Sequence, residues 1–371
     1  MNGFSAAISG VGGAIGRYFS IVSFIPSFFL VGFTFALIES GAWSGSGNLD
    51  WAKAGSAFAD LSNLASLVLV SIVLGIAVHP IQFALVQFFE GYWGTGRWAQ
   101  RARVVRILHH RARYRSYFFG WPLKASNELQ KKDDEATRIA EKANNAKTVA
   151  EMDEAAEAEA QATLDGECRV TLRSIVDEST RLAAEYPPPN DVGNHQEYDN
   201  IVPTRLGNAL RKYERLAGSQ YGLDAVSVIQ QISFVAQPER LSYVGDQRQL
   251  LDLSVRMSAT GIVATLIAIA ALWRHGLWLL LALAPYGVAY LSYRGAVVVA
   301  QEYGAAVAAM IDLDRFALYD ALRLPRPEDT AAERRMNADL MDLLTHDNPD
   351  IVLRYAHPDS PASTNGQSTA P

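Results

Sequence analysis

Four polar side chains stand close to one end of a long apolar stretch, where ionisable groups are costly. The segment 61–78 has no charged residue and is long enough to cross a bilayer as a helix. The four polar residues that follow it are His79, Gln82, Gln87 and Glu90. After the break at Pro80 they fall on one broad helical face. An ionisable residue inside a membrane span is a candidate functional site, such as a proton relay or an ion pathway.

A second interpretation places the same four residues at the membrane surface. Aromatic residues of the kind that gather in the headgroup region follow them closely, at Tyr92, Trp93 and Trp98. The polar face would then be an interfacial edge with no role in chemistry, which is the interpretation we favour. His79 is the deepest of the four, so it keeps the intramembrane alternative open.

A basic segment follows the apolar stretch directly. No carboxylate occurs between Glu90 and Glu128, and seven arginines fall in this interval: Arg97, Arg101, Arg103, Arg106, Arg111, Arg113 and Arg115. Arginines next to an apolar span mark its cytoplasmic end. The segment could also bind anionic lipid headgroups or nucleic acid. We favour an anchor that contacts anionic lipid, and nucleic acid is the least favoured partner.

A third group of polar residues lies on one helix, predicted from Pro203 onward. Arg205, Asn208, Arg211 and Glu214 would form a candidate interaction surface on a cytoplasmic helix. An ordinary solvated face contains the same residue types, so this alternative stays open.

Four apolar segments predict four transmembrane helices, at about residues 18–38, 61–83, 255–273 and 277–293. The connection 41–60 is short and carries no arginine, so we place it on the non-cytoplasmic side. In the first span Ser20, Ser23, Ser27 and Thr34 share a narrow arc suited to helix packing. Pro285 is expected to break the fourth span near its middle.

These segments predict an all-α integral membrane protein, with four transmembrane helices in two hairpins and a helical cytoplasmic domain between them. Residues 18–96 form the first hairpin, 97–254 the cytoplasmic domain with a charged helical segment 126–186, and 255–294 the second hairpin. Residues 295–356 continue as cytoplasmic helices. The stretch 190–201 is polar and loop-like, after three prolines that end the preceding helix.

The two ends of the chain have a different character from the spans. Residues 1–17 are small and apolar and predict an interfacial lead-in, with a flexible terminus as the alternative. Residues 357–371 are rich in Pro, Ser, Thr and Gln and predict a disordered tail. Positive charges near Arg256 and Arg294 lie on the same predicted side as the basic segment, which places both termini in the cytoplasm.

The sequence contains no recognisable catalytic motif. It lacks a phosphate-binding loop, a nucleophile elbow and a His-Glu-x-x-His helix. The single cysteine, Cys168, excludes an intrachain disulfide and a cysteine metal cluster. The adjacent histidines His109 and His110 stand among arginines that would repel a metal ion. We therefore expect no enzyme activity, no cofactor and no metal.

Three short motifs resemble a family of membrane proteins. They are Pro-Thr-Arg-Leu-Gly-Asn at 203–208, Tyr-Gly-Leu-Asp at 221–224 and Asp-Arg-Phe-Ala-Leu-Tyr at 314–319. Together they resemble uncharacterised bacterial multi-pass membrane proteins of actinobacterial type, over about the second half of the chain. The resemblance implies a bacterial plasma membrane and no known activity.

Three functional hypotheses follow. The first is a non-enzymatic scaffold or signalling/effector protein that is anchored in the membrane, acts through its cytoplasmic helices and forms a homo-oligomer or binds a protein partner. The second is an oligomeric channel or transporter that uses the polar face of span two. The third, the least favoured, is a membrane enzyme acting on lipid substrates. Fold class alone does not distinguish them.

Overall fold

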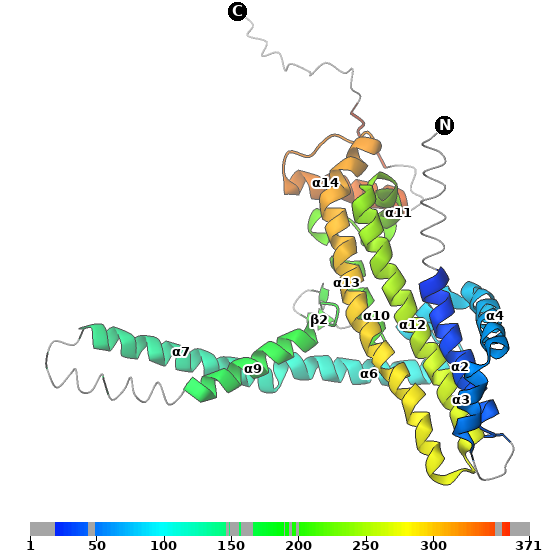
Figure 1. The fold of residues 1–371 in the computed structure, drawn as a ribbon. Helices are drawn as coiled ribbons and strands as arrows, with labels where there is room; N and C mark the ends of the chain where they lie inside the picture. Colours follow the sequence, from blue (N-terminus) through cyan, green and yellow to red (C-terminus); the bar gives the residue numbers. More distant parts are fainter. Residues whose placement is uncertain are drawn as a thin grey trace, which may run out of the picture. The chain divides into compact units, whose positions relative to one another are not determined.

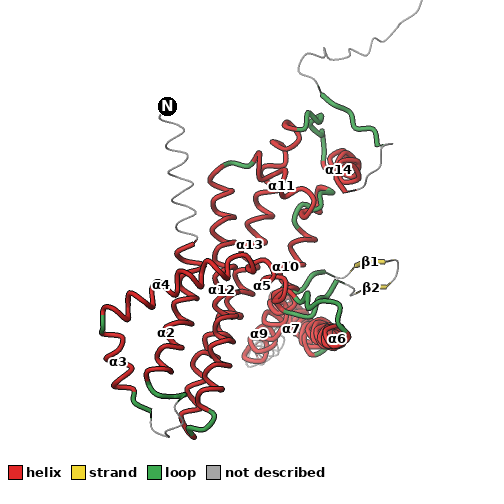
Figure 2. Tube along the Cα trace, turned by 90° about the vertical axis from the view of Figure 1, so that its right-hand side faces the viewer, coloured by secondary structure: helices red, strands yellow, loops and turns green. Residues whose placement is uncertain are grey.

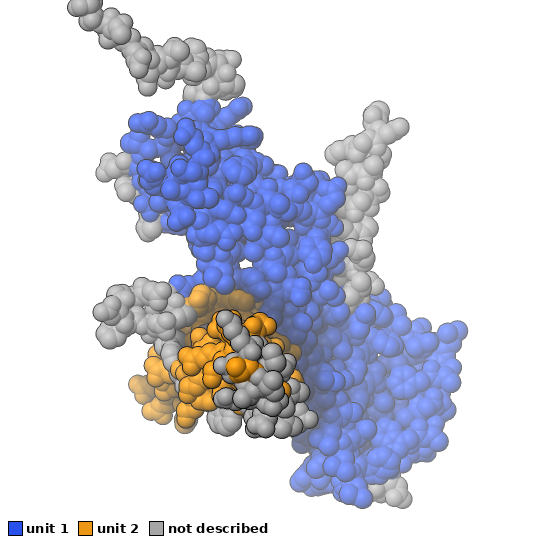
Figure 3. Space-filling view, turned by 90° about the vertical axis from the view of Figure 1, so that its left-hand side faces the viewer, with its two compact units in different colours: residues 1–89, 213–371 blue, residues 90–212 orange. Residues whose placement is uncertain are grey.

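The structure is a computed structural model. It describes residues 19–43, 49–145, 148, 156, 166–188, 190–192, 195–197, 200–345 and 351–356. The predicted terminal segments 1–17 and 357–371 lie outside the described residues. The chain divides into two compact units (Figure 3): unit 1 comprises Met1–Phe89 and Tyr213–Pro371, and unit 2 comprises Glu90–Lys212.

The first half of unit 1 is a series of apolar helices. In chain order they are η1 (Phe19–Phe24, a π-helical stretch), α2 (Ile25–Glu39), α3 (Trp51–Ala59), α4 (Leu61–Val78), η2 (His79–Ile81, a 3₁₀ turn) and α5 (Gln82–Glu90). α2 and α4 are apolar around most of their circumference, as expected for helices that have lipid rather than water beside them. The last residue of α5, Glu90, belongs to unit 2.

The prediction of a plain connection at 41–60 is wrong for its second half, which forms helix α3. The Asp50 carboxylate accepts a hydrogen bond from the Lys53 amide at 2.9 Å and starts α3. The Asp60 carboxylate accepts from the Ser62 amide at 2.9 Å and starts α4. These two aspartates cap helices.

The second half of unit 1 is built on two long helices. Its elements are η3 (Ser219–Tyr221), α11 (Ala225–Val235), α12 (Pro238–Leu272), η4 (Gly276–Ala282, a 3₁₀ segment), α13 (Leu283–Ala321) and α14 (Thr330–Thr345). α12 and α13 lie side by side (Figure 1), and α11 and α14 pack near the end of this pair that is far from α3 (Figure 2). Residues 213–254, predicted to belong to a cytoplasmic domain, therefore fall in unit 1, because α12 runs without a break from Pro238.

Small residues set the distance between α12 and α13. The Ser258 hydroxyl donates to the carbonyl of Ala289 at 3.1 Å, which brings the two backbones into close contact. Next to it, a methyl group at Gly261 would lie 2.8 Å from the amide nitrogen of Ala289. Small residues permit this approach between membrane helices.

We expect Gly261→Ala to destabilise the α12–α13 pair by about 1–3 kcal/mol, because the added methyl group overpacks the contact with Ala289. Gly287→Ala in α13 is the matched control, since nothing lies within 4 Å of the added methyl group. The control should be neutral or more stable by about 1 kcal/mol, from helix propensity alone. Thermal unfolding of both variants in detergent measures the difference, and equal midpoints would contradict this account of the contact.

A separate hydrophobic core joins α11, α13 and α14. Its least exposed members include Ile232, Met310, Ile311, Leu318 and Tyr319, all at most 1% exposed. Gly218 and Gly222, both with φ of 76°, turn the chain tightly around η3 so that α11 can pack on this core. The core lies at the end of the long helices that is distant from the apolar helices α2 and α4.

Four helices of the described residues are long and apolar enough to cross a membrane. They are Val22–Glu39, Leu61–Glu90, Pro238–Leu272 and Gly276–Ala321, which correspond to the four predicted spans. Near the expected break at Pro285, the chain changes from the 3₁₀ segment η4, which ends at Ala282, to the α-helix α13, which begins at Leu283. Pro285 lies in the first turn of α13, where its missing amide hydrogen has no helical partner to lose.

Unit 2 is a set of helices with its own small core. Its elements are α6 (Arg97–Phe119), α7 (Trp121–Asn145), α9 (Gly166–Ala183), β1 (Asn190–Val192), β2 (His195–Glu197) and α10 (Arg205–Leu216), which continues into unit 1. α7 and α9 pack on each other, and Arg169 of α9 pairs with Asp133 of α7. Tyr114, Ala183, Tyr186 and Ile201 form the core.

The prediction of a loop at 190–201 is wrong for part of this range. β1 and β2 pair as a short antiparallel hairpin, with Asn190 opposite Glu197 and Val192 opposite His195. A hairpin this short satisfies the backbone of a polar segment by hydrogen bonding alone, and so it leaves little hydrophobic pattern in the sequence.

Candidate functional site

The least exposed charged side chain among the described residues is Arg256 of α12, which is 1% exposed. Its Nε donates to Oε1 of Gln82 in α5 at 2.7 Å, and its Nη1 donates to Oγ of Ser23 in η1 at 2.6 Å. The amide nitrogen of Gln82 donates in turn to the carbonyl oxygen of Asp252 at 3.2 Å. These four residues, the Arg256 cluster, connect the first, second and third apolar helices.

The charges of the Arg256 cluster continue along α12. Asp252 is buried one turn before Arg256, and its Oδ1 lies 3.4 Å from Nε of Arg248, one turn further back. Two guanidinium groups therefore flank one buried carboxylate on the same side of the helix. Buried charges are stable only when other polar groups surround them, which is what these contacts provide.

Arg256 is the last charged residue of α12 and immediately precedes the helix's charge-free second half, 257–272. A helix rises about 1.5 Å per residue, so Arg256 lies about 24 Å along the axis from Leu272, the last residue of α12. A bilayer core is about 30 Å thick. If Leu272 stands near one boundary of that core, Arg256 lies inside the opposite boundary.

Local features of the sequence bring Gln82 and Ser23 to Arg256. The 3₁₀ turn at His79–Ile81, which contains Pro80, ends α4, and α5 begins directly after it at Gln82. In α4, a methyl group at Gly75 would lie 3.2 Å from the carbonyl oxygen of Ser23. This close approach leaves Ser23 buried and facing α12.

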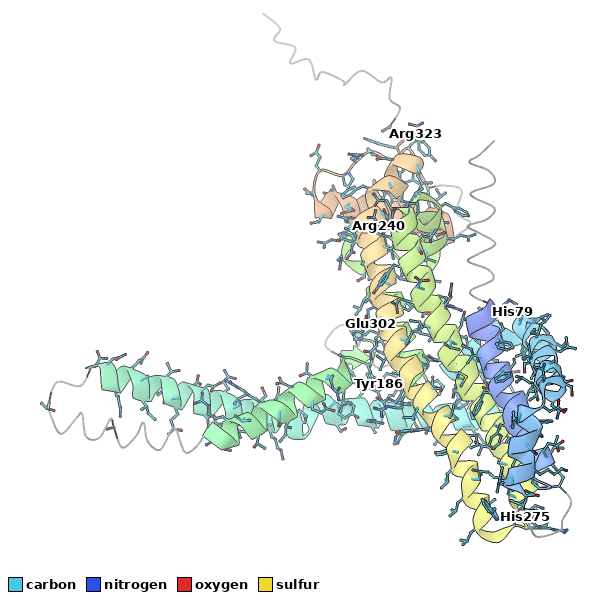
Figure 4. All side chains as sticks on the ribbon, in the orientation of Figure 1. His79, Tyr186, Arg240, His275, Glu302 and Arg323 are labelled. Atoms are coloured by element: carbon cyan, nitrogen blue, oxygen red, sulfur yellow. The ribbon has the colours of Figure 1, made fainter. Side chains whose placement is uncertain are left out.

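The structure separates the four residues of the predicted intramembrane polar site. Gln82 is buried and joins the Arg256 cluster, Gln87 and Glu90 are half-buried, and His79 is exposed. Figure 4 labels His79 at the end of α4 that is distant from His275. A role for His79 stays a prediction. Two residues of the Arg256 cluster were not predicted as part of a site. The sequence suggests Ser23 as a packing residue and Arg256 as a surface charge that marks topology.

The seven predicted lipid-contacting arginines all lie on α6, but they do not share one environment. Arg111 and Arg113 are half-buried, whereas Arg97, Arg101, Arg103, Arg106 and Arg115 are exposed. Among the described residues, Arg97, Arg101, Arg103 and Arg106 form no ion pair with a carboxylate. The guanidinium of Arg101 lies 5.8 Å from the centre of the Trp98 ring.

The predicted interaction helix corresponds to α10, and one of its four residues is not on the surface. Asn208 is fully buried, and its side chain bonds the backbone amide and carbonyl of Val202, each at 2.9 Å. This contradicts the prediction that Asn208 faces a partner, because its amide stabilises the turn before α10. Arg205 forms a bidentate pair with Glu185, while Arg211 and Glu214 are half-buried.

A buried hydrogen bond joins His110 of α6 to Tyr186. The His110 Nδ1 lies 2.9 Å from the Tyr186 hydroxyl oxygen. Burial, and then the nearby Arg106, His109, Arg113 and Arg205, lower the pKa of His110 from 6.5 to about 4. Burial also raises the pKa of Tyr186 to about 12. Both side chains are therefore neutral at pH 7.

We expect this pair to make unit 2 less stable in mild acid. Because the pKa of His110 falls from 6.5 in the unfolded chain to about 4 in the fold, the unfolded state binds the proton more tightly. Stability is full above pH 6.5 and declines as the pH falls toward 4. His110→Phe should flatten this dependence, whereas His109→Phe, at an exposed neighbour, should retain it. Hydrogen exchange of the α6 amides between pH 4 and 6.5 measures the stability of unit 2 in both variants. If stability depends equally on pH in His110→Phe and His109→Phe, the assignment to His110 is contradicted.

An open apolar groove lies between α2 and α4. Its volume is about 450 Å³, and its lining includes Leu30, Phe35, Leu67, Leu74 and Ile267. All of these residues are in helices long and apolar enough to cross a membrane. The lining also includes the polar side chains of Thr34, Asn63 and Ser66, and the groove offers space for an acyl chain.

The described residues contain no group of three His, Cys, Asp or Glu side chains that could hold a metal ion. Comparison with protein-family models, with curated proteins and with solved structures finds no match for this chain. The resemblance to bacterial multi-pass proteins thus stays a prediction.

Proposed function

We propose that this protein is a non-enzymatic scaffold or signalling/effector protein of a bacterial plasma membrane. In this proposal the four apolar helices cross the bilayer as two hairpins, both termini are cytoplasmic, and the helices outside the bilayer bind a protein partner or a second copy of the chain.

The observation that carries the proposal is the length of the two longest helices. α12 has 35 residues and α13 has 39, so they extend about 52 Å and about 58 Å. Both are much longer than a bilayer core of about 30 Å. The surplus length of both helices would continue into the cytoplasm as a packed pair.

The parts of α12 and α13 that exceed the bilayer thickness pack with α11 and α14 into one rigid body. Ion pairs with buried carboxylates add to the hydrophobic core that α11, α13 and α14 share. Arg240 of α12 pairs with Asp314 of α13, and Arg315 of α13 pairs with Glu333 of α14. The Glu333 carboxylate also accepts a hydrogen bond from the Tyr319 hydroxyl at 2.9 Å. A body fixed in this way presents a constant surface, as a scaffold requires.

The topology of the proposal predicts where the single cysteine lies. Cys168 is exposed on α9, so a membrane-impermeant maleimide should label it only after the membrane of spheroplasts is opened. The matched variant combines Cys168→Ser with Trp43→Cys, which replaces an exposed residue of the connection after α2. It should be labelled in intact spheroplasts. Labelling of Cys168 before the membrane is opened would refute a cytoplasmic unit 2.

Photo-crosslinking in cells tests the scaffold function itself. A photoreactive residue would replace Thr137 on α7 or Ser174 on α9, both exposed, with exposed Leu69 of α4 as the lipid-facing control. Discrete protein adducts at Thr137 or Ser174, and none at Leu69, are expected. Strictly monomeric protein by mass photometry in nanodiscs, together with no adduct at any position, would refute the scaffold.

A second candidate function is an oligomeric channel or transporter. The Arg256 cluster favours it, because polar groups buried among membrane helices occur along ion and substrate pathways. The four helices of one chain would need further copies to enclose a path. Liposome flux measures this activity. Flux above background in the unchanged protein that falls with Gln82→Ala or His79→Ala would support a channel or transporter. Flux at background in the unchanged protein and in both variants would exclude it.

A further inference from the structure

Helix α6 has one face that packs into unit 2 and another that is uncovered. His110 and Tyr114 point inward and contact Tyr186. The opposite side, here called the outer face of α6, contains large apolar side chains with high exposure: Trp98 at 83%, Val104 at 55%, Val105 at 65% and Leu108 at 57%. Their spacing places all four within a single arc of the helix.

The outer face combines these apolar residues with arginine. Arg97, Arg101 and Arg115 fall within the same arc, and α6 contains no carboxylate. Arginines stand around most of α6, but its outer face combines them with large apolar side chains that include tryptophan, and an arginine-rich helix without acidic residues is attracted to anionic membranes. Arginine suits this position because its stem packs along apolar groups while its charge reaches the phosphates.

Single exposed apolar residues such as Val170 of α9 and Phe234 of α11 occur elsewhere among the described residues, but most of the others lie in helices long enough to cross a membrane, where lipid would cover them. Leu69 and Val73 of α4 are examples. The outer face of α6 is in none of these helices and so needs another partner. Only residues 91–96 separate α5 from α6, and a chain of that length reaches at most about 25 Å. The start of α6 is therefore held near the end of the second apolar helix.

We propose that α6 lies on the anionic surface of the bilayer, with Trp98, Val105 and Leu108 inserted among the headgroups and acyl chains. This inference rests on the membrane location proposed above. It adds a partner for α6, which is the anionic lipid surface itself. Unit 2 is then bound to the membrane through α6 as well as through its connection to α5, and the exposed sides of α7 and α9 remain accessible.

Spin labels in nanodiscs test this position. In a Cys168→Ser background, one label replaces Leu108 and a control label replaces Ser174, which is exposed on α9. In phosphatidylcholine with about one third phosphatidylglycerol, the label at 108 should collide more with oxygen than with a water-soluble nickel chelate. The label at 174 should show the reverse order. In phosphatidylcholine alone, or with Arg97→Gln and Arg101→Gln, the label at 108 should become more accessible to nickel.

Three outcomes would overturn the proposal. One is equal nickel accessibility at 108 and 174 in both lipid mixtures. Another is an oxygen preference at 108 that does not respond to anionic lipid or to the arginine substitutions. The third is protection of the label at 108 by added duplex DNA without any effect of lipid. A label at Leu69 distinguishes a failure of this proposal from a failure of the proposed membrane location. If the label at 69 is accessible to nickel, the membrane location is refuted. If it is accessible to oxygen and the label at 108 is not, only the position of α6 is refuted.

Discussion

Arg256→Ala is expected to destabilise the helical bundle of unit 1 strongly. Removing the guanidinium leaves the Gln82 carbonyl oxygen and the Ser23 hydroxyl buried without the donor that each contacts at 2.7 Å and 2.6 Å. Each buried polar group left without its partner costs about 1–3 kcal/mol, so the total is about 2–6 kcal/mol. Thermal unfolding in detergent measures the change, with loss of the monodisperse size-exclusion peak as the readout.

Two variants separate this network from a general effect of arginine loss. Arg294→Ala removes an exposed arginine of α13 and should change stability little. Arg256→Lys retains the charge but lacks the planar fork that contacts both Gln82 and Ser23, so it should rescue only partly. Replacing all three side chains together, as Ser23→Ala, Gln82→Leu and Arg256→Met, should be less harmful than Arg256→Ala, because the two polar side chains that accept from the guanidinium are removed with it. Equal effects of Arg256→Ala and Arg294→Ala would show that the network does not stabilise the bundle.

Arg240→Ala is expected to destabilise the body formed by α11 to α14, because it leaves the buried Asp314 carboxylate without its partner. Arg240 donates two hydrogen bonds to Asp314, at 2.8 Å and 2.5 Å. The Asp314 side chain is 3% exposed, and that of Arg240 is 29% exposed. Figure 4 labels Arg240 in the part of α12 near α14. Since water reaches Arg240 but hardly reaches Asp314, the loss falls mainly on the carboxylate.

A similar ion pair on the surface provides the control. Arg326 also donates two hydrogen bonds to one aspartate, Asp320, but these side chains are 71% and 48% exposed. Exposed pairs contribute about 0–1 kcal/mol, so Arg326→Ala should have a small effect. In a double-mutant cycle, Arg240→Ala combined with Asp314→Ala should cost less than the sum of the single changes. Simple additivity at Arg240 and Asp314, measured by denaturant unfolding, would contradict the assignment.

The three motifs behind the resemblance to bacterial membrane proteins have clear structural roles. In the first motif, the Thr204 hydroxyl donates to the carbonyl of Glu90 and accepts from the Gly207 amide. In the second, the ring of Tyr221 stacks below the Arg315 guanidinium, and Asp224 caps α11. Residues such as these stabilise turns and helix starts, so the motifs are explained by folding without any ligand.

The sequence alone predicts the helical class and the four apolar helices, because both depend on local composition. A charge-free run such as 61–78 needs no distant contact to identify it. The ends of elements such as α9, which stops before three prolines, are predictable for the same reason. The seven arginines of α6 are also visible in the sequence as a candidate lipid contact.

The tertiary structure decided which of these residues are buried and what they contact. Arg256 and Gln82 are separated by 174 positions in the chain, and no local pattern pairs them. The sequence suggests that Asn208 is part of a solvated face, whereas in the fold its side chain bonds the turn at Val202 and is buried. The outer face of α6 could be identified only after His110 and Tyr114 defined the inner one. Burial and pairing depend on contacts between segments that are distant in the chain. Composition and periodicity could therefore indicate Arg256, Asn208 and the arginines of α6 as notable residues. They could not assign these residues to the Arg256 cluster, the turn before α10 or the membrane surface.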